Sequence, residues 1–238
     1  MAKERLDKLI ASTGRWSRRE VKTLVREGRV LVDGRIAGSA EEKYDAESCR
    51  IAVNGEELLL RRHTYVMLHK PAGVLSATED GRGRTVLGLL TPELRKIGVF
   101  PVGRLDKDTE GLLLLTDDGE LAHALLSPKK HVDKVYYARV SGRLTPEDCA
   151  AFEAGMTLGD GLECLPAGLE ILAAGETSEC LVTLREGKFH QVKRMLAARG
   201  KPVTYLKRLS MGSLRLDDTL APGEFRLLTA AEEAQLQR

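Results

Sequence analysis

Residues 103–116 read GRLDKDTEGLLLLT, a short polar loop followed by a strongly apolar segment. Gly103 and Gly111 bracket the loop, and the run of leucines predicts a buried strand. Catalytic groups concentrate on loops that a rigid scaffold positions, and Arg104 stands two residues before Asp106, where its charge would favour the ionised carboxylate. The same composition is typical of any solvated loop, and on the residues alone that simpler interpretation is favoured.

Outward from this stretch, the chain beyond about Tyr65 is built mainly from short β-rich segments, separated by Gly, Pro or Asp. Helices are expected at fewer places, over 117–126, 145–154, 190–199 and 230–238. Strands outnumber helices and do not alternate regularly with them, which predicts an α+β domain with a mixed, mostly antiparallel β-sheet flanked by helices. The other predicted strands read YVMLHK (65–70), KVYYARV (134–140), CLVTLRE (180–186), PVTYLKR (202–208) and SLRL (213–216).

The first sixty residues predict a separate small module. An apolar stripe in RLDKLI (5–10) predicts one helix, and Ser17 with Glu20 forms the capping-box pattern of a second. Asp33-Gly34 and Asn54-Gly55 are short-hairpin signals. We therefore expect two domains, residues 1–60 and residues 61–238.

Charge is unevenly distributed within this module. Residues 1–35 hold ten Lys/Arg and five Asp/Glu, a net of +5, whereas residues 36–60 hold two and six, a net of −4. Arg18, Lys22 and Arg26 recur every four residues and share one face of the second helix. A surface helix often carries such charges, but their concentration here favours a phosphate-binding face.

Composition and motif searches exclude several classes of protein. The 238 residues carry a net charge of +2 and are 42% hydrophobic, which is globular rather than histone-like or disordered. No apolar run approaches the ~20 residues of a membrane span, and the N-terminus lacks an apolar signal core, so a cytoplasmic protein is expected. The four cysteines form no CxxC pair and the five histidines no metal-ligand spacing, so no metal site is predicted.

Two further basic stretches suggest an extended polyanion as ligand. Residues 185–208 hold eight Lys/Arg and one acid, a net of +7, and residues 127–143 hold five and one, a net of +4. The aromatic residues within them could stack on unpaired bases, although Tyr136 and Tyr137 could equally be strand core.

The N-terminal module resembles a known RNA-binding module. RLDKLI followed by SRREVKTLVREGRVLVDGR (17–35) is similar to the αL module of the S-four type, over roughly residues 3–50. The helix caps and the VxVDG turn occur together, which makes the match fairly specific. The resemblance implies binding of structured RNA and says nothing of catalysis.

The remainder of the chain resembles the rRNA branch of the pseudouridine synthases. The motifs are HKPAGVLSA (69–77), the GRLD stretch, KVYYARV, EGKFHQVKRMLAARG (186–200) and LKRLSMGSLRL (206–216), in the family's order and spacing. The small-subunit pseudouridine synthase A subfamily is the most similar, because of the lysine in HQVKRM and the compact length. The resemblance implies cofactor-free isomerisation of a uridine within ribosomal RNA.

The resemblance also implies roles for individual residues. Asp106 would be the essential carboxylate, Lys193 its basic partner, and Tyr136 the ring that packs on the uracil. Asp108 is expected only to solvate or cap the loop. The sequence leaves open whether Asp106 attacks C1′ or removes a proton at C2′. The residues expected to bind substrate are Arg104, Leu206, Arg194, Arg18, Lys22 and Arg26.

Alternatives remain at this stage. The same reaction on large-subunit rRNA would use every motif named above, and a non-catalytic assembly factor would use the same RNA-binding surfaces. A glycoside hydrolase would need a second carboxylate facing one bond, and none can be nominated. The expected partner is ribosomal RNA or a subunit assembly intermediate, bound by a monomer.

Overall fold

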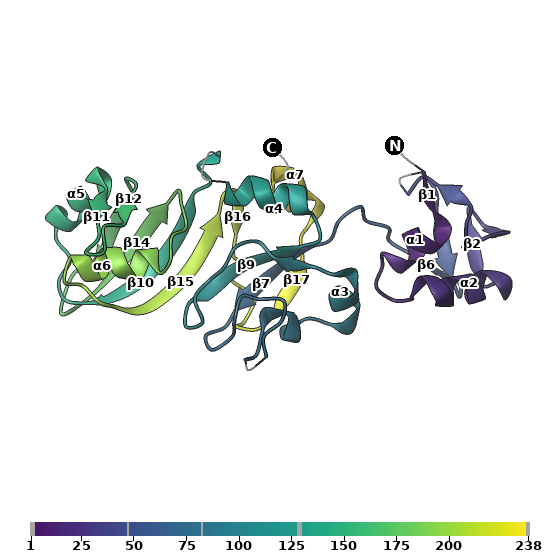
Figure 1. Ribbon diagram of the computed structural model, residues 1–238, viewed down its shortest axis with the longest axis horizontal. Coiled ribbons are helices and arrows are strands. Elements are labelled where there is room, and N and C mark those ends of the chain that lie inside the picture. Colours follow the sequence, from purple (N-terminus) through teal and green to yellow (C-terminus); the bar gives the residue numbers. More distant parts are fainter. Residues whose placement is uncertain (1–2, 47, 82, 128–129, 237–238) are drawn as a thin grey trace. The chain divides into compact units, whose positions relative to one another are not determined.

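The computed structural model describes residues 3–46, 48–81, 83–127 and 130–236 (Figure 1). The chain divides into two compact units. The first is Met1–Thr64 together with Leu90–Val99, and the second is Tyr65–Leu89 together with Phe100–Arg238. The division after Thr64 lies four residues beyond the expected boundary at 60, and the segment Leu90–Val99 is counted with the first unit rather than the second.

In the first unit, helices α1 and α2 pack with small β-sheets, and a third helix, α3, comes from the segment Leu90–Val99. The capping box is present: the Ser17 hydroxyl accepts from the Glu20 amide, and the Glu20 carboxylate accepts from the Ser17 amide at 2.6 Å. The helix that this box caps is α2 (Arg18–Arg26), and its apolar face is buried in the core of this unit. Its elements are β1 (Glu4–Arg5), α1 (Leu6–Ala11), α2 (Arg18–Arg26), β2 (Val30–Val32), β3 (Arg35–Ile36), β4 (Lys43–Tyr44), β5 (Ile51–Val53), β6 (Glu56–Glu57) and α3 (Pro92–Ile97).

Both predicted hairpins of this unit are confirmed. β2 pairs with β3 across Asp33-Gly34, and β5 pairs with β6 across Asn54-Gly55. Asp33 and Asn54 adopt positive φ angles of 50° and 56°, as the tight two-residue hairpin turn requires. The two hairpins join through β2 and β5 into one four-stranded sheet.

The second unit is built on a larger sheet. Its elements are β7 (Tyr65–Lys70), the 3-10 helix η1 (Val86–Leu89), β8 (Phe100–Pro101), β9 (Glu110–Thr116), α4 (Gly119–Leu126), β10 (Lys134–Ser141), α5 (Pro146–Ala154), β11 (Met156–Thr157), β12 (Glu163–Cys164), β13 (Gly168–Ala173), β14 (Thr177–Leu184), α6 (Gln191–Ala198), β15 (Val203–Met211), β16 (Leu214–Arg215), β17 (Phe225–Leu227) and α7 (Ala230–Leu236). The C-terminal helix predicted to Arg238 is described only to Leu236, and Lys129 of the basic stretch 127–143 also lies outside the described residues.

The large sheet has the order β13-β14-β10-β15-β9-β7-β17, with β16 on β15 and β8 on β9. Among the described strands, only β9 and β15 pair in parallel, so the prediction of a mixed, mostly antiparallel sheet is confirmed. Gly111 stands at this parallel contact with φ +104°, and a Cβ there would lie 2.2 Å from the Arg208 carbonyl oxygen. The second glycine of the GRLDKDTEG stretch therefore allows two strands to approach closely.

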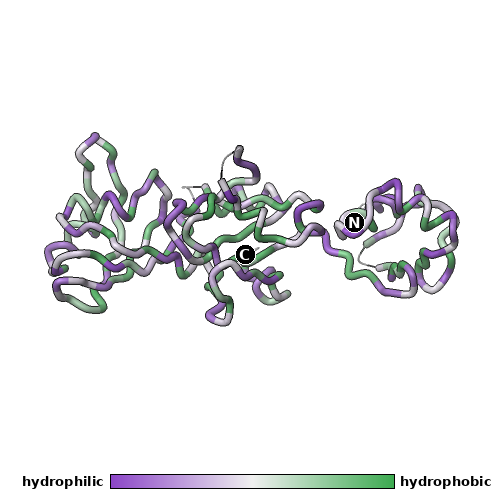
Figure 2. Tube along the Cα trace, turned by 90° about the horizontal axis from the view of Figure 1, so that it is seen from below, coloured by the Kyte–Doolittle hydropathy of each residue, from purple (hydrophilic) through white to green (hydrophobic). Residues whose placement is uncertain are grey.

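Two hydrophobic cores hold this unit together. Helices α5 and α6 pack with β10, β14 and β15, and α4 and α7 pack with β7 and β9. Figure 2 shows hydrophobic residues concentrated along the central strands. The GRLD loop leads from one core into the other, since Leu105 belongs to the first and Leu112 to the second.

None of the helices in the described part of the chain combines the length and apolar character that crossing a membrane requires.

Candidate active site

One pocket in the second unit gathers five of the predicted residues. It has a volume of about 70 Å³. The lining residues come from the loop before β9, from β10, from the end of β14 and the loop that follows it, from α6 and from β15. The predicted residues among them are Arg104, Asp106, Tyr136, Lys193 and Leu206.

Hydrogen bonds to Ser76 and within the loop itself fix the loop that carries Asp106. The Ser76 hydroxyl donates to the Leu105 carbonyl at 2.9 Å and accepts from the Leu105 amide at 3.0 Å. The Thr109 amide closes a turn onto the Asp106 carbonyl at 3.1 Å. The Thr109 side chain lines the pocket, and its buried hydroxyl has no hydrogen-bond partner among the described residues.

A buried lysine also fixes this loop, and sequence reasoning missed it. The Lys70 side chain at the end of β7 is fully buried, and its ammonium donates to the carbonyls of Pro71 at 3.0 Å, Lys107 at 3.2 Å and Thr109 at 2.8 Å. Burial lowers the pKa of Lys70 to about 8. The available signal was a lysine followed by proline at the end of an otherwise apolar strand.

Asp106 lies between two basic side chains. Its Oδ2 is 2.9 Å from the Lys193 ammonium, and its Oδ1 is 3.5 Å from His190 Nε2. The Asp106 side chain remains 24% exposed, so a ligand in the pocket can reach it. The predicted pairing of Lys193 with the aspartate is therefore present in the geometry.

Asp108 does more than the solvating role expected for it. Its Oδ1 accepts from the Lys193 ammonium at 2.6 Å, so two carboxylates share one cation. The hydrogen bond from Lys193 holds the pKa of Asp108 below its usual range. Burial alone would lower the pKa of Lys193, but hydrogen bonds to Asp108 and Asp106 outweigh it and raise that pKa.

His190 is a pocket residue that sequence reasoning did not single out. It is the residue before α6 and adopts the left-handed conformation, with φ 50°, that a side chain other than glycine rarely takes. Its ring stacks on Phe189, with 3.8 Å between centroids and 18° between planes. Its position at the start of HQVK, three residues before Lys193, was the signal in the sequence.

Tyr136 and Leu206 form the apolar side of the pocket. They lie on the neighbouring antiparallel strands β10 and β15 and are 9% and 5% exposed. Arg104 lines the pocket from the loop before Asp106. A carboxylate beside a cation, facing an aromatic ring and an apolar wall, can receive a planar base and act on the sugar attached to it.

Arg194 is directed elsewhere. Its guanidinium forms an ion pair with Asp160, and it does not line the pocket. The sequence motif alone therefore overstates how much of α6 faces the ligand.

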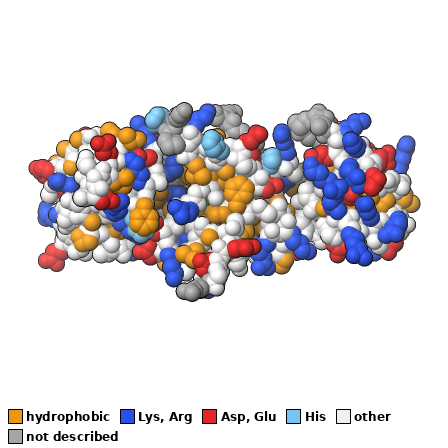
Figure 3. Space-filling view, in the orientation of Figure 1, with side chains coloured by type: hydrophobic (Ala, Val, Ile, Leu, Met, Phe, Trp, Pro, Cys, Tyr) orange, Lys and Arg blue, Asp and Glu red, His pale blue; other side chains and the backbone are white. Residues whose placement is uncertain are grey.

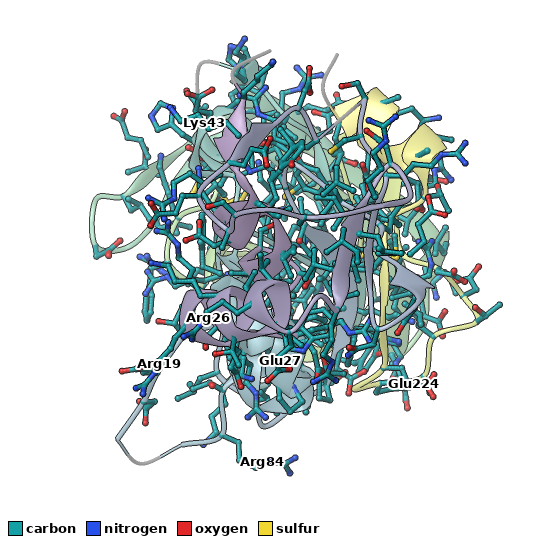
Figure 4. All side chains as sticks on the ribbon, turned by 90° about the vertical axis from the view of Figure 1, so that its right-hand side faces the viewer. Arg19, Arg26, Glu27, Lys43, Arg84 and Glu224 are labelled. Atoms are coloured by element: carbon teal, nitrogen blue, oxygen red, sulfur yellow. The ribbon has the colours of Figure 1, made fainter. Side chains whose placement is uncertain are left out.

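The three basic residues of α2 that were predicted to bind RNA belong to the first unit, and two of them form ion pairs there. Arg18 pairs with Asp7 at 2.9 Å, and Lys22 pairs with Glu41 at 3.3 Å. Arg26 is exposed and donates to the Thr23 hydroxyl and the Lys22 carbonyl. Figure 3 shows Lys and Arg side chains numerous on this unit, with Asp and Glu among them, and Figure 4 labels Arg26 at its surface.

Two protein-family models match the chain. The model described as RNA pseudouridylate synthase matches residues 64–198, and the S4 domain model matches residues 4–48.

Curated relatives match over almost the whole length. An uncharacterised RNA pseudouridine synthase of Bacillus subtilis is 50% identical over 229 residues, which is 96% of each chain. The ribosomal small subunit pseudouridine synthase A of Vibrio cholerae is 40% identical, over 98% of this chain and 99% of its own. The ribosomal large subunit pseudouridine synthase B of Bacillus subtilis is 39% identical, over 98% and 96%.

A solved structure, a crystal structure of a pseudouridylate synthase, superposes with a TM-score of 0.68. It is 35% identical in sequence, and the match covers 98% of this chain and 99% of that one.

Proposed function

The chain belongs to the RNA pseudouridylate synthase family, and from that premise we propose that it converts one specific uridine of small-subunit ribosomal RNA to pseudouridine. The resemblance predicted from the GRLD and HQVKRM motifs is thereby confirmed, as is the class of enzyme. The names of the relatives divide between small-subunit and large-subunit RNA, at 40% and 39% identity. Lys193 and the compact length support the small-subunit choice.

The reaction sets clear physical demands. The bond between uracil N1 and C1′ breaks, the base turns, and a new bond forms from C5 to C1′. C5 then loses its proton and N1 gains one, so the product is an isomer of uridine and no water is consumed. The uridine must first leave the base stack, which costs a few kcal/mol. Arg104, at the pocket lining, would offset that cost by filling the gap that the base leaves in the stack.

Asp106 is the proposed reactive group. Whether a carboxylate attacks C1′ or removes a proton at C2′, it must be ionised and within reach of the ribose. The Lys193 ammonium at 2.9 Å and the partial exposure of the Asp106 side chain support both requirements. This ion pair, in a pocket walled by Tyr136 and Leu206, is the observation that carries the proposal. Tyr136 would pack on the uracil while it turns.

The rest of the RNA would be held outside the pocket. We propose that the basic side of α2, with Arg18, Lys22 and Arg26, binds phosphates of the ribosomal RNA. We also propose that the enzyme acts as a monomer. Ribosomal RNA as substrate would place the enzyme in the cytoplasm.

The test is carbodiimide mapping of pseudouridine in small-subunit and large-subunit rRNA transcripts, after incubation with the wild-type protein and with Asp106→Asn. We expect one new reverse-transcription stop, in the small-subunit RNA, with the wild type alone. Asp106→Asn is nearly isosteric, so it should retain its affinity for RNA while losing turnover. A normal rate in this variant would refute the role of Asp106.

The other outcomes are equally informative. A stop only in the large-subunit transcript would refute the choice of substrate and leave the reaction intact. If neither transcript is modified, partly assembled subunits become the substrate to test, and failure on these as well would refute ribosomal RNA as the substrate.

A further inference from the structure

Phe189 is an exposed aromatic side chain beside the pocket. It is 70% exposed, while its neighbour His190 lines the pocket and stacks against it in near-parallel planes. Aromatic residues make up only 4% of this chain, and Phe189 is one that is not used in a hydrophobic core. The two stacked rings form a flat surface that begins at the pocket and ends in solvent.

The loop that bears these rings is braced. Gln191 accepts from the Lys188 amide at 3.0 Å and donates to Glu186 at 2.6 Å. Glu186 is buried and also accepts from the Leu165 amide at 2.9 Å. Because both ends of the short turn are tied, the rings are held in position before any ligand arrives, which reduces the entropy lost on binding.

The stack is also connected to the reactive carboxylate. His190 Nε2 lies 3.5 Å from Asp106 Oδ1. The pocket volume of about 70 Å³ is too small for two nucleotides. The nucleotides on either side of the target must therefore bind outside the pocket, close to these rings.

We propose that Phe189, backed by His190, is a stacking site for the unpaired base next to the target uridine. A flipped uridine leaves one face of each neighbouring base without a stacking partner. Arg104 would cover one of these two faces, and the exposed face of Phe189 would cover the other. Aromatic side chains commonly serve unpaired RNA bases in this way, independently of sequence. The inference rests on the proposed function, since it assigns a subsite of the same active site.

The experiment is a double-mutant cycle between protein and RNA. A stem-loop spanning the mapped uridine is prepared intact, and with an abasic nucleotide on its 5′ or on its 3′ side. Turnover is then measured as kcat/KM with the wild type and with Phe189→Ala. We expect Phe189→Ala to lower kcat/KM about 5- to 150-fold on intact RNA. With one of the two abasic RNAs, the wild type should show a similar loss of kcat/KM. On that RNA, Phe189→Ala should not lower kcat/KM any further.

Two controls separate stacking from folding. Phe189→Trp should retain or improve kcat/KM because it keeps the aromatic face. Leu172→Ala removes another half-exposed apolar side chain, on β13, and should change nothing. Wild-type kinetics in Phe189→Ala, or losses that simply multiply with both abasic RNAs, would overturn the inference.

A binding measurement distinguishes failure of the inference from failure of the proposed function. Trp16 is the only tryptophan in the chain, so Trp16→Phe with Phe189→Trp gives a single reporter at the site. A short oligouridylate should quench its fluorescence, whether or not rRNA transcripts are modified. No quenching would count against the stacking site, while quenching without any pseudouridine would count against the proposed substrate alone.

Discussion

Replacing Lys70 with methionine tests whether a buried cation holds the reactive loop. The Lys70 ammonium donates to the carbonyls of Lys107 and Thr109, which lie on either side of Asp108. Methionine fills a similar volume but leaves these two carbonyls without that donor. Each unsatisfied buried acceptor costs about 1–3 kcal/mol, whereas removing a buried charge recovers desolvation energy. The two effects oppose each other, so the pH dependence is the diagnostic quantity.

The sign of that dependence follows from the pKa of Lys70. Burial lowers it from 10.5 to about 8, so between those values the unfolded chain binds a proton that the folded chain has released. The free energy of unfolding therefore rises with pH across this window. At 1.36 kcal/mol per pKa unit, the Lys70 contribution amounts to about 3.4 kcal/mol over the whole window and about 1.3 kcal/mol between pH 7 and pH 9.

The assay is urea unfolding at pH 7, 8 and 9, with and without Lys70→Met, in a Trp16→Phe background. Tyrosine fluorescence then reports mainly on the second unit, because four of the five tyrosines lie there. Between pH 7 and pH 9, the free energy of unfolding of the parent should rise by about 1.3 kcal/mol more than that of Lys70→Met. Lys96 is an exposed lysine on α3, and Lys96→Met serves as the control for the loss of a lysine that is not buried. A difference that stays constant with pH would refute the reasoning.

Two further predictions concern charge. Lys193→Met should lower kcat and should raise the pKa of Asp108 towards its ordinary value, which a carbon-13 NMR titration measures. Lys193→Arg should keep part of the wild-type kcat and part of the lowering of that pKa. An unchanged pKa of Asp108 in Lys193→Met would show that Lys193 does not bind that carboxylate in solution. Replacing Arg18, Lys22 and Arg26 together with glutamine should flatten the dependence of log Kd on log salt for rRNA, by about 0.7–0.9 for each phosphate that these side chains neutralise in the wild type. An unchanged slope would mean that these side chains do not bind the RNA.

The sequence predicted the fold where the local signal was strong. Long strands such as β7 and β10 and the capped helices α2 and α5 lie close to their expected bounds. α3 was missed although Thr91 caps it, Pro92 starts it and Gly98, at φ +87°, follows it. Short strands outside the predicted hairpins, such as β8 and β17, were missed for a different reason. β17 exists because Phe225 and its neighbours pair with β7, a partner that no local pattern reveals.

Apart from the pairing of Asp106 with Lys193, which the family resemblance implied, the candidate site was predicted as a set of residues and not as a set of contacts. GRLD and HQVK lie far apart in the chain, and only the packing of α6 against the sheet brings Lys193 to Asp106. Asp108 has the pattern of a loop residue, and its share of the Lys193 ammonium depends on the same long-range approach. Lys70 lies within an apolar strand, where its three carbonyl partners come from loop geometry that the sequence does not encode locally.

Counting charge along the sequence also misjudged the electrostatics near the pocket. Of the eight Lys and Arg side chains in residues 185–208, five form ion pairs with carboxylates. Four of these five pair with acids outside that stretch. A further one of the eight, Arg208, is buried. At the pocket itself, Asp106 and Asp108 share the single ammonium of Lys193. These three side chains together have a net charge of −1, so they do not themselves attract a phosphate. We propose that they face the neutral base and ribose of one nucleotide, and that exposed basic side chains, such as Arg26, bind the backbone phosphates.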